Sequence, residues 1–307
     1  MSKLVLIDGN AILFRAYHAL PPLTSKDGTI VNAVYGFFSM LFKIIEQTTP
    51  QYLVVCFDRP KPTFRHALYV GYHANRPKMA DDLVPQIGIV HEVLEKIDVT
   101  IFEVDGYEAD DLIGTIAYQT QSAKLKAQNL ETIIVTGDRD LLQLVNPHVK
   151  LLMPITGITN MSLFDEKAVE EKYGVKPRQF IDYKALIGDA SDNYPGVAGI
   201  GPKTASSLLR KYQTFEGLYE HMSELPEKIA TRLATDAEQA VLAKKLATIA
   251  CDVPITLNLA YSDCCHIDAD KIKEAFEKLG FKTLQNRIPK QILEETKRKK
   301  GDQLGLL

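Results

Sequence analysis

The chain has 307 residues, of which 46% are hydrophobic and 24% are charged, and its formal net charge is −3. These values are typical of a globular protein with a sizeable core, and no apolar run is long enough to cross a membrane. The N-terminal run MSKLVLIDGN lacks the length and the cleavage site of a signal peptide. The cysteines show no CxxC spacing and are Cys56, Cys251, Cys264 and Cys265. We therefore expect a cytoplasmic protein with free thiols, in which nucleic-acid binding would require a local basic surface.

Short apolar runs alternate with helical patterns in the first half of the chain. Strands are expected over Lys3–Asp8, Tyr52–Asp58, Val99–Val104 and Glu131–Asp138. Helices are expected over Val34–Ile45, over Gln86–Ile97 and from about Glu108 onward. This alternation predicts an α/β core with a mainly parallel central sheet over residues 1–163.

A long basic segment, residues 59–85, separates the second strand from the next helix. It contains five basic residues among three aromatic ones: Arg59, Lys61, Arg65, Arg76 and Lys78, with Phe64, Tyr69 and Tyr72. Connections of this length in compact domains are either functional or disordered. The segment is therefore either a flexible loop or an arch that contacts substrate, and the sequence leaves both interpretations open.

Only helices are expected over residues 164–290, followed by a charged tail or linker over residues 291–307. Within this region, residues 181–212 contain the run NYPGVAGIGPKTA. Gly196, Gly199 and Gly201 indicate a tight turn, and Lys203 and Thr204 lie in the first turn of the following helix. Backbone N–H groups at such a helix start bind phosphate, so we interpret these residues as a helix-hairpin-helix that holds the DNA backbone. A plain interhelical turn would need only one glycine.

Acidic residues follow the predicted strands and recur in the helical region. They are Asp8, Asp58, Glu108, Asp110, Asp111, Asp138, Asp140, Asp189 and Asp192. Each taken alone has a structural explanation, such as a turn or the capping of a helix start. Ligands of parallel α/β sheets bind beyond the carboxyl ends of the strands, so these side chains are expected to gather at one edge.

Carboxylates gathered in this way repel one another. Two carboxylates about 5 Å apart repel by roughly 3 kcal/mol at an effective dielectric constant of 20. Divalent cations would remove this repulsion, and an all-carboxylate ligand set suits Mg²⁺ or Mn²⁺. The seven histidines show no zinc-ligand spacing. We therefore predict a metal site for phosphoryl chemistry.

Several motifs occur in the order found in one enzyme family. The runs LIDGN, VVCFDRPKPTFRH, GYEADDLIG, VTGDRDLLQLV, ALIGDASDNYPGVAGIGPKTA and LATIACDVP resemble the 5′-nuclease (5′→3′ exonuclease, flap endonuclease) family, as found at the start of bacterial DNA polymerase I. The resemblance implies a resolvase-like (PIN-like) core followed by a helical domain with a helix-hairpin-helix (H3TH), in a bacterial cytoplasm. It also implies two Mg²⁺ or Mn²⁺ ions, one surrounded by Asp8, Asp58, Glu108, Asp110 and Asp111 and the other by Asp138, Asp140, Asp189 and Asp192. A monovalent cation such as K⁺ would bind backbone carbonyls between Val197 and Ile200.

The resemblance further implies how DNA is contacted. Phe14 would stack near the scissile nucleotide, while Arg15, Arg76 and Lys78 would act on the phosphates at the catalytic centre. Further DNA contacts would come from Arg65, His73, Gly199, Gly201, Lys203 and Thr204. His73 departs from the family, because many relatives have lysine there and a mostly neutral imidazole stabilises transition-state charge less well near pH 7. Our hypothesis is that Arg76 or Lys78 compensates, or that turnover falls at high pH.

The expected function is structure-specific hydrolysis of DNA, and of RNA primers, near a single-strand/duplex junction during replication and repair. The expected partners are DNA with 5′ flaps, nicks or primers and a DNA polymerase, fused or separate, and we expect a monomer. A non-catalytic DNA-binding module is the main alternative, but it predicts missing acids and all of them are present. A receiver-type regulator would leave the basic segment and the glycine-rich hairpin unexplained. The sequence leaves open an RNase-biased activity, the preference among flaps, nicks and gaps, and whether the chain is free-standing or part of a polymerase.

Overall fold

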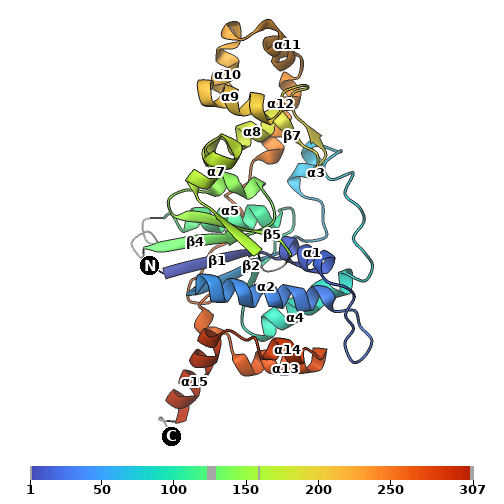
Figure 1. Cartoon of the computed structure of the whole chain (residues 1–307), viewed down its shortest axis with the longest axis vertical. Coiled ribbons are helices and arrows are strands. Elements are labelled where there is room, and N and C mark those ends of the chain that lie inside the picture. Colours follow the sequence, from blue (N-terminus) through green and yellow to red (C-terminus); the bar gives the residue numbers. More distant parts are fainter. Residues whose placement is uncertain (1, 123–128, 158–159, 305–307) are drawn as a thin grey trace.

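A six-stranded sheet lies at the centre of the computed structural model, which describes residues 2–122, 129–157 and 160–304 (Figure 1). The strand order is β3-β2-β1-β4-β5-β6, and all neighbours pair in parallel except β5 and β6. The strands are β1 Ser2–Asp8, β2 Tyr52–Cys56, β3 Thr100–Phe102, β4 Leu130–Val135, β5 Val149–Thr156 and β6 Asn160–Phe164. The predicted α/β fold with a mainly parallel sheet is confirmed, although β5 and β6 were not predicted.

Helices cover both faces of the sheet because its central strands are apolar on both sides. In β1, Leu4 and Leu6 face one apolar cluster, whereas Val5 and Ile7 face the other. The first face is covered by α5 Ala109–Gln119 and the 3-10 helix η1 Asp140–Leu144. The second face is covered by α1 Gly9–Ala19, α2 Asn32–Thr48 and α4 Val84–Lys96.

The strands β2 and β4 end two to three residues earlier than the apolar pattern predicted. Asp58 and Asp138 therefore lie in the loops that follow these strands, whereas Asp8 is the last residue of β1. The chain order places β2 and β3 on one side of β1 and β4 on the other. The strand order thus reverses between β1 and β4, which is where open α/β sheets bind ligands.

A helical region packs against the α5 side of the core (Figure 1). It consists of α7 Glu166–Tyr173, η2 Pro177–Gln179, α8 Phe180–Ile187, α9 Pro202–Tyr212, α10 Phe215–Glu220, η3 Met222–Glu224, α11 Glu227–Thr235 and α12 Ala237–Ala247. The two short strands β7 Gly188–Asp189 and β8 Tyr194–Pro195 pair between α8 and α9. The helix α7 ends at Gly174, whose φ of 71° is left-handed.

After α12 the chain returns to the core. Val253 N–H donates to Thr115 Oγ1 (3.1 Å) and Leu257 N–H donates to Gln119 Oε1 (2.8 Å), so this stretch runs beside α5. It leads to η4 Cys264–His266, α13 Ala269–Leu279, α14 Lys282–Gln285 and α15 Lys290–Leu304. Phe276 of α13 lies within 6 Å, ring centre to ring centre, of two phenylalanines of α2. Residues 164–290, which were expected to form one helical domain, are therefore divided. The part up to α12 forms the helical region, and the later part packs against the core.

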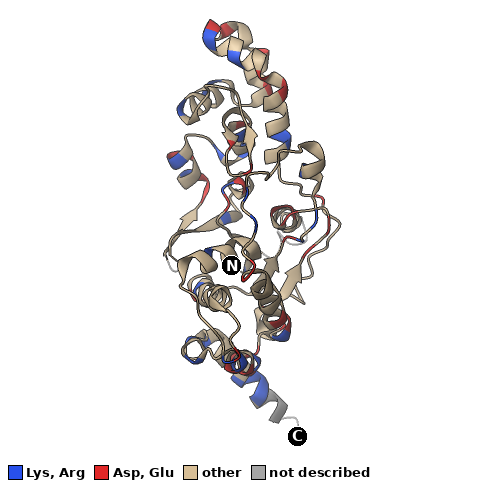
Figure 2. Ribbon diagram, turned by 90° about the vertical axis from the view of Figure 1, so that its right-hand side faces the viewer, with Lys and Arg blue, Asp and Glu red and all other residues tan. Residues whose placement is uncertain are grey.

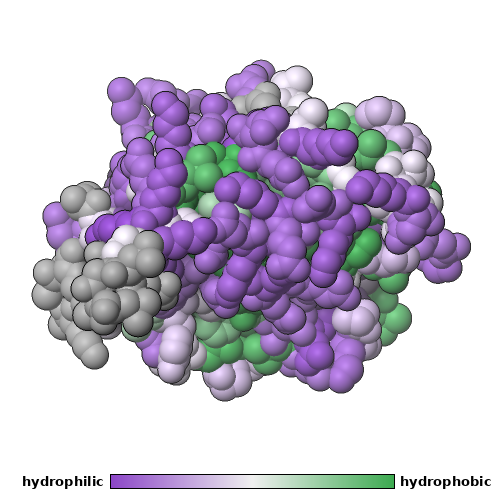
Figure 3. All heavy atoms as spheres, turned by 90° about the horizontal axis from the view of Figure 1, so that it is seen from below, coloured by the Kyte–Doolittle hydropathy of each residue, from purple (hydrophilic) through white to green (hydrophobic). Residues whose placement is uncertain are grey.

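The stretch expected as a charged tail begins with an ordered helix. In α15, Ile292 is only 2% exposed and belongs to the apolar cluster of α2 and α4. Figure 3 views the molecule from this end, where hydrophilic residues cover most of the surface and apolar residues show between them. Within the described residues, no helix combines the length and apolarity needed to span a membrane.

Candidate active site

A cavity of about 270 Å³ opens at the carboxyl ends of the central strands. Its lining includes seven of the nine predicted acids: Asp8, Asp58, Glu108, Asp110, Asp138, Asp140 and Asp192. Phe14 of α1 and Arg76 of the basic segment also line it. Figure 2 shows charged residues of both signs between the core and the helical region, where the cavity lies. The sheet has therefore brought together most of the acids that the sequence pattern singled out.

Asp8 is held at the start of α1. Its Oδ1 accepts a hydrogen bond from Ala11 N–H (2.9 Å) as the N-cap, and its Oδ2 accepts one from the Thr136 hydroxyl (2.7 Å). Burial and the nearby Asp58 carboxylate raise the pKa of Asp8 to about 7. An added cation would lower this pKa, so the position is suited to metal binding.

Asp110 and Asp111 are neighbours in the first turn of α5 but face different surroundings. Asp110 lines the cavity, and no described residue donates a hydrogen bond to its carboxylate. Burial and then the Asp138 and Asp8 carboxylates raise its pKa well above the usual range. Asp111 is fully buried, accepts from the backbone N–H groups of Glu108 (3.1 Å) and Ala250 (2.8 Å), and does not line the cavity. The expectation that Asp111 surrounds a metal is thus corrected, because its oxygens already have partners.

Arg65, expected to contact DNA, is instead the buried partner of Asp111. Both of its terminal nitrogens donate to Asp111 at 2.8 Å, and Nη1 also donates to Glu108 (3.0 Å). Its Nε donates to Leu246 O and Nη2 to Thr248 O, so all five N–H groups are used. Arg65 therefore joins α3 Phe64–Leu68 to α5 and to the end of α12, and it has no donor left for a phosphate.

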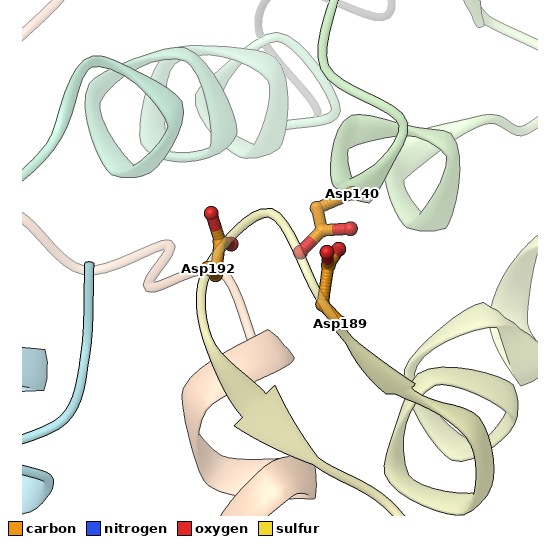
Figure 4. A group of neighbouring side chains, drawn as sticks. All are labelled: Asp140, Asp189 and Asp192. Atoms are coloured by element: carbon orange, nitrogen blue, oxygen red, sulfur yellow. The ribbon is translucent and has the colours of Figure 1, made fainter. Parts of the chain in front are cut away.

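A second group of carboxylates lies between η1 and the β7–β8 loop. One oxygen each of Asp140, Asp189 and Asp192 lies within 4.8 Å of the others, and Figure 4 shows these side chains gathered around one point. Asp189 lines a neighbouring cavity of about 570 Å³ that shares Gly137 and Asp138 with the first. Burial and the adjacent Asp138 carboxylate raise the pKa of Asp140 to about 8, despite an ion pair with a lysine.

That lysine, Lys184, was not predicted as a site residue. Its Nζ lies 2.5 Å from Asp140 Oδ1 and also contacts Asp189. A signal was present in the sequence, because Lys184 interrupts the apolar run of FIDYKALI in α8. Tyr72 was likewise missed as a site residue: its hydroxyl donates to Glu108 Oε2 (3.1 Å), and Tyr72 lines the cavity.

The basic segment closes one side of the cavity. His73 Nε2 lies 3.2 Å and Arg76 Nη2 lies 2.7 Å from Asp192 Oδ1. Burial alone would raise the pKa of Asp192, but the hydrogen bonds and charges of His73 and Arg76 lower it to about 2. Lys78 pairs with Asp81 at the surface and Arg15 Nε donates to Gly157 O, and neither lines the cavity.

The helix-hairpin-helix turn is tightly built. Gly188 has a φ of 73°, and a Cβ on it would lie 2.3 Å from Gly196 N, so both positions require glycine. Arg232 of α11 donates to Gly199 O (2.7 Å), while Val197 O accepts from Ile200 N–H (3.0 Å). These carbonyls, expected to bind a monovalent cation, already accept hydrogen bonds. The helix start that follows carries three residues expected to contact DNA, of which Gly201 and Lys203 are exposed and Thr204 is partly exposed.

Comparison with known proteins identifies the family. A model described as the 5′-3′ exonuclease N-terminal resolvase-like domain matches residues 3–174, and one described as the 5′-3′ exonuclease C-terminal SAM fold matches residues 175–270. The chain belongs to the 5′-3′ exonuclease family. The 5′-3′ exonuclease of Aquifex aeolicus is 36% identical over 290 residues, which cover 94% of this chain and 96% of that protein.

Members of the 5′-3′ exonuclease family also include parts of longer proteins. DNA polymerase I of Bacillus caldotenax is 40% identical over 296 residues, which are 96% of this chain but 33% of that polymerase. The chain therefore spans about a third of the length of the polymerase relatives that it matches. The T5 D15 protein crystallised with metal ions has a similar fold, with a TM-score of 0.64, 20% identity, and 96% and 99% of the two chains covered. The catalytic core of Rad2 in complex with a DNA substrate is also similar in fold, with a TM-score of 0.59 and 13% identity. The match covers 94% of this chain and 91% of that one.

Proposed function

We propose that this chain is a divalent-metal-dependent 5′ nuclease that hydrolyses phosphodiesters in DNA carrying 5′ flaps, nicks or RNA primers, near the single-strand/duplex junction, in replication and repair. The observation that carries the proposal is the convergence of seven carboxylates on one cavity. Pro202, at the glycine-rich start of α9, lines the neighbouring cavity that shares Asp138 with the first. Family membership supports a nuclease activity. A DNA polymerase, fused or separate, is the protein partner that the relatives suggest.

The donor set fits hard divalent cations, because it offers carboxylate oxygens without histidine or thiolate. One ion would be held by four acids of the first group, Asp8, Asp58, Glu108 and Asp110. The other ion would be held by the second group, Asp138, Asp140, Asp189 and Asp192. Two Mg²⁺ or Mn²⁺ ions supply an activated water and stabilise the charge on the attacking and leaving oxygens. Raised pKa values at Asp8 and Asp140 support this assignment, because buried acids without a cation resist ionisation.

The remaining side chains would bind and orient the strand. Arg76 is half exposed at the cavity and can exchange Asp192 for a substrate phosphate. Phe14 lines the same cavity and offers an apolar face to a nucleobase. Lys203 and the first N–H groups of α9 would hold the duplex backbone without reading its sequence.

Cleavage of a fluorescent 5′-flap duplex tests this function. In Mg²⁺ we expect cuts at the junction, no cuts in EDTA, and a rate at least about a hundredfold lower for Asp138→Ala, since a ligand carboxylate is lost. Asp81→Ala is the matched control, because Asp81 is exposed and, among the described residues, pairs only with Lys78. Binding of the flap without cleavage in either Mg²⁺ or Mn²⁺ would contradict the proposal and favour a DNA-binding module.

A further inference from the structure

Lys184 places a buried positive charge inside the second carboxylate group. Its helix, α8, buries Phe180, Ala185 and Leu186 in the core, which fixes where the lysine side chain can reach. Lys184 is only 7% exposed, and its ammonium lies 2.5 Å from Asp140 and also contacts Asp189. These are two of the three carboxylates that surround one point in Figure 4.

The charges explain why the ammonium is there. Burying an ammonium is unfavourable unless opposite charges compensate, and the acids beside it would repel one another without a cation. Asp140 Oδ1 is buried and, apart from this ion pair, has no hydrogen-bond partner among the described residues. Lys184 therefore supplies the positive charge that this oxygen lacks.

A divalent ion would need the same oxygens. Mg²⁺ takes carboxylate ligands at about 2.0–2.1 Å, so an ion bound by Asp140 and Asp189 would lie too close to an ammonium that contacts both. The neighbouring cavity of about 570 Å³ is lined by Lys184 together with Asp189, Tyr183 and Ser191, and it offers the side chain space away from Asp140 and Asp192, which do not line it.

We propose that Lys184 is an internal counter-cation, which holds Asp140 and Asp189 together in the metal-free protein and withdraws into the neighbouring cavity when Mg²⁺ or Mn²⁺ binds. The lysine thereby competes with the metal and sets the concentration at which the second ion is bound. This inference rests on the proposed function, because it assigns the second carboxylate group to a metal. A lysine that only orients Asp140 would instead stay in place and support metal binding.

Calorimetric titration of the full chain with Mn²⁺ alone separates these roles. For Lys184→Met we expect one Mn²⁺ ion to bind about tenfold or more tightly than in the wild type, because the competing charge is gone. In EDTA the variant should melt at a lower temperature, and Mn²⁺ should raise its melting temperature more than that of the wild type. Lys244→Met is the matched control, since Lys244 pairs with Asp182 and Glu216 and does not line either cavity. Equal or weaker Mn²⁺ binding by Lys184→Met would overturn the inference.

A measurement on the wild type avoids dependence on a variant that fails to fold. In ¹⁵N-labelled protein in EDTA, the Lys184 ammonium should give an NMR signal that is protected from solvent exchange. Saturating Mg²⁺ should remove this signal. The signal is assigned to Lys184 by its absence from the Lys184→Arg variant. A signal that persists unchanged in Mg²⁺ would overturn the inference. If the wild type binds no Mn²⁺ at all, the proposed function fails as well, whereas wild-type binding with no competition by Lys184 refutes only the role of the lysine.

Discussion

Asp110 and Asp111 are adjacent aspartates whose side chains lie in two different environments. One turn of helix contains 3.6 residues, so adjacent side chains point about 100° apart. Asp110 thereby faces the other acids of the cavity, while Asp111 faces Arg65 and caps its own helix. The three acids at the start of α5 thus fit both roles that the sequence suggested, because capping explains Asp111 and the proposed metal site would explain Asp110.

The two residues should therefore affect stability in opposite directions. The pKa of Asp110 is raised in the folded state, so its ionisation reduces the stability of the metal-free protein as pH rises above about 4. At about pH 8 in EDTA, Asp110→Asn should raise the free energy of unfolding, because burial and the neighbouring carboxylates oppose the charge that the amide lacks. Asp111→Asn should lower it by about 3 kcal/mol, because Arg65 loses its charged partner.

Urea unfolding of the three proteins in EDTA measures both effects. The gain from Asp110→Asn should shrink as the pH falls to about 4 and below, because the wild-type carboxyl then becomes protonated in the unfolded state as well. A destabilising Asp110→Asn at pH 8 would show that this carboxylate is already compensated in the metal-free protein.

The sequence predicted the acids but not their partners. The position of an acid after an apolar strand is local information, and it located Asp8, Asp58 and Asp138 correctly at the cavity. Whether an acid is free or paired depends on residues far away in the chain, such as Arg65, which is 46 residues from Asp111. Local pattern could therefore not exclude Asp111 or separate the buried Arg65 from the exposed cations.

At the scale of helices and strands, the sequence pattern missed several elements at the margins of the core. β6 is an edge strand in which only Phe164 is buried, and β5 contains Pro154, so neither has the sequence pattern of a buried strand. α15 is rich in charged residues and contributes few apolar contacts beyond Ile292, which made it resemble a tail. The basic segment is also more ordered than a loop, since it forms α3 and then docks on the helical region.

Beside the contacts of His73 and Arg76 with Asp192, a second side chain of the β7–β8 loop, Asn193, holds the basic segment. Asn193 donates to Gly71 O (2.7 Å) and accepts from Asn75 Nδ2 (2.6 Å), so its amide joins the basic segment twice. Asn193→Ala should loosen the segment and speed tryptic cleavage after Lys78 several-fold. Asn75→Ala removes one of the two bonds and should have a smaller effect. Equal cleavage rates for all three proteins, followed by mass spectrometry, would show that other contacts hold the segment.

At the scale of the whole molecule, the end of the described chain belongs to the core. Phe276 is fully buried, and its ring packs against Phe38, Phe42 and Phe281. Phe276→Ala should lower the free energy of unfolding by about 3–5 kcal/mol, although the residue lies on the other side of the sheet from the helical region.

Chemical unfolding followed by far-UV circular dichroism measures this change. Exposed Tyr261→Ala is a suitable control, because its side chain buries little surface, and it should leave stability nearly unchanged. A loss below about 1 kcal/mol for Phe276→Ala would mean that α13 contributes little to the stability of the core.

The position of α15 also bears on how the protein can be handled. This helix leaves the core at the end opposite to the helical region, as Figure 1 shows, and Arg298 on it is well exposed. A dye or surface tether attached at position 298 would therefore stand away from the cavity and the helix-hairpin-helix. Single molecules immobilised through α15 would present the cavity and the start of α9 to solution.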